Sequence, residues 1–146
     1  MKQFLVEDQF EIRSIDADGK HFSKVSRMVC YGERYDMDMV CDFNSEIYPL
    51  EAGQKLDVAL TLTLNDDGSI DESKQYNPLL KSKLMDDFEY IMHGKVFKIK
   101  QPEKTDAKLE VFISYGGLLM SLKGNPLNLQ NIELDANVYL LIRKKN

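Results

Sequence analysis

Acidic residues and a glycine stand together in the segment Asp16–Gly19 (Asp-Ala-Asp-Gly), a composition that suits a calcium ion. An EF-hand loop needs carboxylates at its first, third and fifth positions, glycine at the sixth and glutamate at the twelfth. Here Lys20 and His21 hold the fifth and sixth positions, and Arg27 holds the twelfth. Because aspartate and glycine are also the residues that tight turns favour, we predict a turn at this segment and no calcium site.

Thiol and imidazole groups are the other candidate metal ligands. Cys30 and Cys41, with His21 and His93, would have to complete a tetrahedral zinc site, but neither cysteine belongs to a C-x-x-C pair. Cys41 lies on the apolar face of an expected strand, which favours a buried thiol that packs as a small hydrophobic side chain. His93 stands in another strand-like run, which favours a hydrogen-bonded structural histidine. We therefore expect no metal and no cofactor.

Catalytic motifs do not occur in the sequence. It has no G-x-S-x-G elbow, no H-E-x-x-H pattern and no phosphate-binding loop. Pairs of carboxylates leave one enzymatic alternative open, because their separations depend on the fold. The interpretation we favour is a protein that is not an enzyme.

Composition sets further limits. The 146 residues carry a net charge of −5, from 19 Lys and Arg against 24 Asp and Glu, which gives no global attraction for nucleic acid. No apolar stretch approaches about 18 residues, so the chain has no membrane-spanning helix candidate. The length fits one domain over residues 1–146. Two cysteines and a polar N-terminal segment predict a reducing intracellular compartment without disulfides.

Single-stranded nucleic acid is a ligand that small barrels bind with basic side chains set among exposed aromatic rings. In the run 89–100, strict alternation puts Lys98 and Lys100 on one face and Phe97 on the other. We expect the lysines to be solvated and Phe97 to be buried. The basic end at 143–145 is expected to be solvated too. The sequence therefore disfavours nucleic-acid binding, although it remains the alternative function.

These positions lie on segments that alternate apolar and polar residues, which is typical of β-strands with one buried face. The buried face of the clearest run comprises Tyr35, Met37, Met39, Cys41 and Phe43. The other expected strands are 10–15, 24–31, 56–64, 89–100 with a kink allowed at Gly94, 109–115, 118–123 and 138–143. Turn residues separate them. The sequence thus predicts about eight strands and no long helix.

Many short strands in a small chain are best closed as an antiparallel β-barrel, because closure removes exposed strand edges. A barrel of this size is expected to be filled by side chains, which disfavours a small-ligand pocket; the expected filling includes Met37, Met39, Leu60 and Leu62. Residues 66–87 interrupt the alternation and are interpreted as one long polar surface loop. The predicted fold class is all-β.

Several apolar residues occupy positions where the alternation calls for polar ones. Val40, Phe112 and Leu119 stand among polar neighbours on faces that should be solvated. The run 138–143 is apolar on both faces, so either the chain itself or another protein must cover each side. Both kinds of cover stay open at this stage.

The segment 111–124, VFISYGGLLMSLKG, is too particular to be a generic hairpin. It resembles the eighth-subunit family of eukaryotic DNA-directed RNA polymerases, the small subunit common to polymerases I, II and III. The resemblance covers nearly the whole chain and continues in DADGK at 16–20, DFN at 42–44, IYP at 47–49, TLN at 63–65, FEYIMHGK at 88–95 and YLLIRK at 139–144.

This resemblance implies an OB-fold-like antiparallel barrel in the nucleus that docks on the largest polymerase subunit, within the polymerase core, and catalyses nothing itself. Neither sequence-specific nucleic-acid contact nor a membrane is implied. We expect the hairpin 111–120 to contribute to docking; the alternative is that it only closes the barrel. The candidate interface residues are Phe112, Tyr115, Gly116, Gly117, Leu118, Leu119 and Met120.

Overall fold

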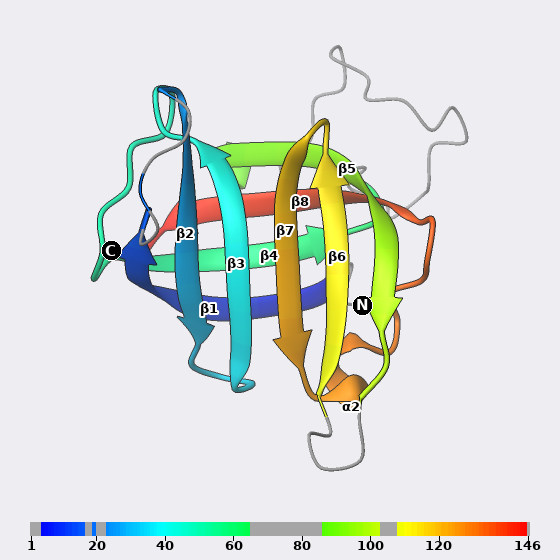
Figure 1. The fold of residues 1–146 in the computed structure, drawn as a ribbon. Coiled ribbons are helices and arrows are strands. Elements are labelled where there is room, and N and C mark those ends of the chain that lie inside the picture. The colour runs from blue at the N-terminus through cyan, green and yellow to red at the C-terminus, as the bar shows by residue number, and fades with distance from the viewer. Residues whose placement is uncertain (1–3, 17–18, 20–22, 65–85, 103–107, 146) are drawn as a thin grey trace.

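The computed structural model describes residues 4–16, 19, 23–64, 86–102 and 108–145. Within these ranges the chain forms eight strands and the short helix α2 (Figure 1), and residues 86–87 are helical as well. The strands are β1 (Phe4–Ile15), β2 (Val25–Gly32), β3 (Met37–Asn44), β4 (Lys55–Thr61), β5 (Tyr90–Lys100), β6 (Leu109–Tyr115), β7 (Leu118–Gly124) and β8 (Asn137–Lys144), and the helix is α2 (Pro126–Leu129). The expected surface loop at 66–87 lies almost wholly outside the described residues.

The strands close into a barrel in the order β1-β2-β3-β7-β6-β5-β8-β4, and every pairing is antiparallel. Strands β2, β3, β7 and β6 lie side by side toward the viewer in Figure 1, while β1, β4 and β8 cross behind them. The first half of β5 pairs with β8 and its second half pairs with β6, so this strand turns the corner between the two layers. The prediction of an all-β barrel of about eight strands is confirmed.

One strand begins later than the alternation predicted. Tyr35 was assigned to the buried face of β3, but it lies in the preceding turn and is 36% exposed. The buried carboxylate of Asp8 accepts hydrogen bonds from the backbone N–H groups of Arg34 and Tyr35, at 3.0 and 3.1 Å. Asp36 follows with a φ of +54°, which ends the turn. The placement of Tyr35 was therefore wrong, because a carboxylate from β1 holds this turn outside the strand.

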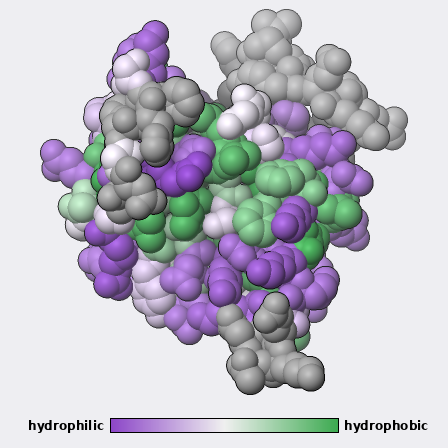
Figure 2. Space-filling model, viewed as in Figure 1, coloured by the Kyte–Doolittle hydropathy of each residue, from purple (hydrophilic) through white to green (hydrophobic). Residues whose placement is uncertain are grey.

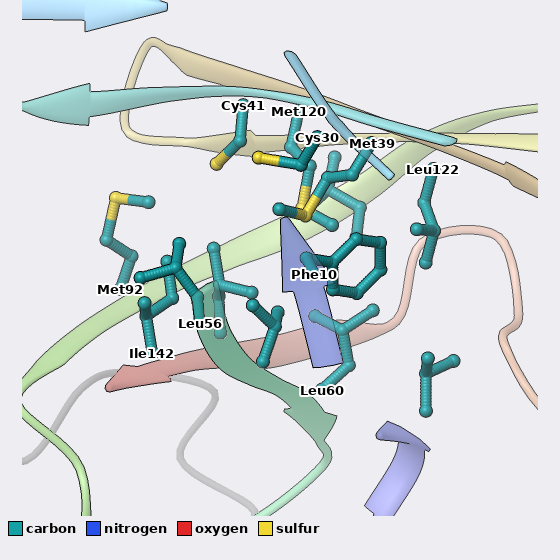
Figure 3. Close-up of a cluster of buried hydrophobic side chains, with 14 of the residues drawn as sticks. Phe10, Cys30, Met39, Cys41, Leu56, Leu60, Met92, Met120, Leu122 and Ile142 are labelled. Atoms are coloured by element: carbon teal, nitrogen blue, oxygen red, sulfur yellow. The ribbon is translucent and has the colours of Figure 1, made fainter. Parts of the chain in front are cut away.

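Side chains fill the inside of the barrel, as the sequence indicated (Figure 3). Met37, Met39 and Leu60 are buried, and Leu62 is half-buried against the same core. Cys30 and Cys41 are free, buried cysteines on β2 and β3. Burial raises the pKa of the Cys30 thiol to about 12 and that of Cys41 well above its ordinary value. Both thiols therefore stay protonated at neutral pH and pack as small hydrophobic groups.

The strand with two apolar faces is covered by its own chain. On the outer side of β8, Tyr139 and Leu141 are buried in a second cluster with Leu64 and Phe88. His93 lies on β5 beside this cluster, with its ring centroid 4.7 Å from that of Tyr139, and burial lowers its pKa. The outer side of β8 is therefore covered at Tyr139 and Leu141 by residues that follow β4 and precede β5.

The basic C-terminal residues are also held by the chain. The Arg143 Nε donates to Asp57 Oδ2 at 3.1 Å, and its guanidinium lies 4.9 Å from the centroid of the Phe88 ring. The Lys144 Nζ lies 5.1 Å from the centroid of the Tyr48 ring. These contacts correct the expectation that this segment is merely solvated.

Acid is expected to destabilise this end of the barrel through Glu89. The Tyr48 hydroxyl donates to Glu89 Oε1 at 2.5 Å and the Lys144 backbone N–H donates to the same oxygen at 2.8 Å. These hydrogen bonds lower the pKa of Glu89 from its ordinary 4.5, the Tyr48 bond most of all. The folded state then binds fewer protons, so the stabilisation is complete above the ordinary pKa and is lost as pH falls through the lower folded value.

Thermal melting of the wild type and Glu89→Gln, followed from about pH 6 to about pH 3, measures this effect. The difference between their melting temperatures should shrink as the pH falls. Parallel curves over the whole range would show that the Glu89 carboxylate adds no pH-dependent stability.

Candidate protein-docking face

Strands β6 and β7 form a tight hairpin with Gly116 and Gly117 as its two-residue turn. Their φ angles are +63° and +102°, in the region that favours glycine. Turns of this kind match the right-handed twist of the flanking strands, and this one sets Tyr115 opposite Leu118. The turn expected at these two glycines is confirmed.

The hairpin register divides the candidate interface residues between the two faces of the sheet. Tyr115 and Met120 point into the barrel with 5% and 2% of their surfaces exposed. The Tyr115 hydroxyl donates to the Met120 Sδ at 3.4 Å, and burial raises the pKa of Tyr115 well above its ordinary value. Both residues belong to the core and are not available to a partner.

The remaining candidates lie on or near the surface. Leu119 is 43% exposed and Phe112 is half-buried on the outer face, while Leu118 is half-buried against the core. Gly116 and Gly117 are exposed at the turn. The sequence selected a continuous run of residues, whereas successive strand residues face opposite sides. That alternation was the available signal for separating the two groups.

The three anomalous apolar residues meet on one outer face of the barrel. Ser121 of β7 lies opposite Val40 on β3 and opposite Phe112 on β6. Leu119 is the next outward position on β7, and the exposed Val29 of β2 lies opposite Val40. We call Val29, Val40, Phe112 and Leu119 the outer apolar face. Figure 2 views the barrel from this side and shows hydrophobic residues gathered on it.

One aromatic residue next to the outer apolar face was placed wrongly by the sequence. The register of β5 against β6 passes from Val96 opposite Ile113 to Lys98 opposite Phe112, so Phe97 is the extra residue of a β-bulge. Phe97 is consequently 48% exposed instead of buried. The signal was the phase of the apolar positions, because Val96 and Ile99 cannot both face inward on an unbroken strand.

The exposed ring extends the apolar surface. The centroids of the Phe97 and Phe112 rings are 6.2 Å apart at an interplanar angle of 47°, and the Lys98 Nζ lies 5.5 Å from the centroid of the Phe112 ring. The sequence disfavoured nucleic-acid binding because it predicted no exposed aromatic rings among basic residues. The structure places Phe97 and Lys98 together on an exposed strand, so this reason no longer holds.

A carboxylate beside the outer apolar face fixes the hairpin to β3. Asp42 accepts hydrogen bonds from the Nε and Nη2 of Arg27 at 2.6 and 3.1 Å. Its Oδ2 also accepts the backbone N–H of Leu119 at 3.0 Å. One buried side chain thus joins β2, β3 and β7 where Leu119 is presented.

The segment at Asp16–Gly19 has the contacts of a turn at its described residues. The backbone N–H of Gly19 donates to the Asp16 carbonyl at 2.8 Å, and the Asp16 carboxylate accepts the backbone N–H of Arg27 at 2.9 Å. Across the described ranges, no group of three or more His, Cys, Asp or Glu side chains is placed to hold a metal ion. In those same ranges no helix is long and apolar enough to cross a membrane.

A filled, closed barrel with apolar side chains gathered on one outer face defines a class of small all-β subunit that can bury that face against another macromolecule. A family comparison makes the assignment specific. The chain belongs to the RNA polymerase Rpb8 family, whose model matches residues 7–144. The resemblance carried by segment 111–124 is thereby confirmed.

Curated relatives are similar over their full lengths. The chain is 48% identical over 144 residues to the DNA-directed RNA polymerases I, II, and III subunit rpabc3 of Dictyostelium discoideum, covering 99% of each chain. It is 41% identical over 146 residues to the probable RPABC3 subunit of Caenorhabditis elegans, covering 99% of this chain and 98% of the relative. It is 42% identical to subunit 8B of polymerases II, IV and V of Arabidopsis thaliana, covering 96% and 95% of the two chains.

Proposed function

We propose that this chain is a non-catalytic subunit shared by nuclear RNA polymerases I, II and III, and that it docks as one barrel domain on the largest subunit. Its full-length similarity to relatives named as shared polymerase subunits is the observation that carries the proposal. We infer that the outer side of the hairpin 111–120 makes the contact, because Phe112 and Leu119 are apolar, outward-facing and held in place by the Gly-Gly turn and Asp42.

Charged residues at these two positions are expected to prevent assembly. Burying a Phe or Leu side chain is worth about 2 kcal/mol, so Phe112→Glu with Leu119→Glu should weaken association by roughly 100-fold or more. The measurement is the recovery of the largest polymerase subunit with the tagged variant from nuclear extract at high salt, where a mainly apolar contact persists.

Leu127→Glu supplies the matched control, because Leu127 is 73% exposed and lies on α2, beyond the end of β7 that is remote from the Gly-Gly turn. This variant should assemble like the wild type. Circular dichroism establishes that each variant is folded. Full recovery of the polymerase with a folded Phe112/Leu119 variant would overturn docking through the hairpin.

A further inference from the structure

We propose that the docking face continues from the hairpin onto β5, where Phe97 is a further apolar anchor and Lys95, Lys98 and Lys100 bind an acidic segment of the polymerase partner. This inference rests on the proposed function and names the chemistry of the partner at that site. The occupant is a protein segment that carries carboxylates next to an apolar side chain.

The bulge in β5 creates this extension. Before the bulge Met92, Gly94 and Val96 face the core, and after it Ile99 is the residue that packs against the core. The extra residue leaves both Phe97 and Lys98 on the outside. An exposed phenylalanine ring leaves apolar surface in contact with water, which is unfavourable, and it adds nothing to the core. Its position at a bulge therefore points to burial against a partner.

Phe97 is continuous with the outer apolar face. Its ring packs on Phe112, which lies opposite Ser121, which in turn lies opposite Val40. Each of the five adjacent strands β2, β3, β7, β6 and β5 thus carries an outward apolar side chain, with Ser121 between Val40 and Phe112. An isolated exposed apolar residue needs no explanation, whereas a contiguous set marks an interaction surface.

The charge of β5 selects the partner. Lys95, Lys98 and Lys100 are all exposed on the outer side of one strand, although the whole chain has a net charge of −5. The Lys95 Nζ lies 4.0 Å from Asp135 Oδ1, both side chains being largely exposed, and such a pair contributes little. Across the described part of the chain, no ion pair involves Lys98 or Lys100. Carboxylates of a partner are the complement to this strand.

A protein fits the whole face better than a nucleic acid does. Bases would stack on Phe97 and Phe112 and phosphates would pair with the lysines. Val29, Val40 and Leu119 offer no stacking surface, yet they are part of the same continuous face. Aliphatic anchors are buried by apolar side chains of a protein.

Competition for assembly tests the proposal. Each tagged variant is co-expressed with untagged wild-type chain, and the ratio of the two is measured in purified polymerase. Phe97→Ser and Lys98→Glu should each be depleted by about tenfold, and the depletion of Lys98→Glu should decrease as the salt concentration rises. Lys98→Arg, which keeps the positive charge, should be incorporated like the wild type.

The controls are Leu127→Ser for the apolar change and Lys24→Glu for the charge reversal, since Lys24 has a 67% exposed side chain before β2. Both should be incorporated like the wild type. If the β5 variants match their controls while the Phe112/Leu119 variant is excluded, the extension onto β5 is wrong and hairpin docking stands. If the Phe112/Leu119 variant is incorporated normally, docking through the hairpin is overturned and the extension onto β5 falls with it. Absence of the tagged wild-type chain from purified polymerase would instead overturn the proposed function.

Binding of the free barrel to a labelled single-stranded oligonucleotide separates the competing ligand. We expect wild type and Lys98→Glu to bind this probe equally weakly. Binding that is lost in Phe97→Ser and Lys98→Glu, with normal incorporation of both variants into polymerase, would assign β5 to nucleic acid and overturn the proposal.

Discussion

Replacement of Gly94 by alanine is expected to lower the free energy of unfolding by about 4 kcal/mol, a large share of the total for a domain of this size. A Cβ atom at Gly94 would meet the Ser114 carbonyl oxygen at 2.2 Å and the Tyr115 Cδ1 at 2.5 Å. The nearest atom is backbone of the neighbouring strand, so no side-chain rotation relieves the clash. Either β5 separates from β6 or the barrel corner opens.

Gly53→Ala is the comparison variant. Gly53 has a φ of +94° but open space around the position of a Cβ, so alanine there should cost only about 1 kcal/mol of backbone strain. Thermal melting should show a fall of roughly 10 °C for Gly94→Ala and a much smaller one for Gly53→Ala. Equal melting temperatures for the Gly94→Ala and Gly53→Ala proteins would mean that β5 and β6 can move apart at little cost in free energy.

Replacement of Asp42 by alanine is expected to cost about 3 kcal/mol of stability, because it removes a bidentate pair and leaves the Leu119 N–H without its acceptor. The Arg27 side chain is half exposed and can be hydrated again after the substitution. Much of the cost therefore comes from the Leu119 N–H and from the loss of its hydrogen bond between β7 and β3. Urea unfolding measures the stability, and hydrogen exchange at the Leu119 amide measures the local opening.

Asp57→Ala is the matched control, since Asp57 also pairs with an arginine, Arg143, at 3.1 Å but is more exposed than Asp42. That change should cost about 0.5 kcal/mol. Because Asp42 holds the strand that presents Leu119, Asp42→Ala should also reduce incorporation into polymerase. Equal stability of the two alanine variants, with slow exchange at Leu119, would show that Asp42 does not hold the hairpin.

Sequence alternation was sufficient for most of the strands. It placed β6 at its observed bounds and most other strands within a few residues, because inward and outward side chains differ in polarity on a barrel filled with apolar groups. The burial of Cys41 and the Gly-Gly turn followed from the same local rules. The segment 111–124 carried the family likeness.

Errors arose where distant groups acted on a strand. Tyr35 left β3 because Asp8, 27 positions earlier, accepts its N–H. Phe97 left the core because β5 passes from β8 to β6 and takes up an extra residue in doing so. The local pattern around Tyr35 carries no sign of its cause, whereas the phase of Val96 and Ile99 was the one local signal at Phe97.

The sequence by itself determined the fold class, the turn at Gly116 and Gly117 and the family, since each depends on residue type and on spacing along the chain. Only the tertiary structure decided that Val40, Phe112 and Leu119 share one surface and that Phe97 joins them. Those residues belong to four different strands, and side chains on different strands become neighbours through the register of strand pairing, which the barrel sets when it closes.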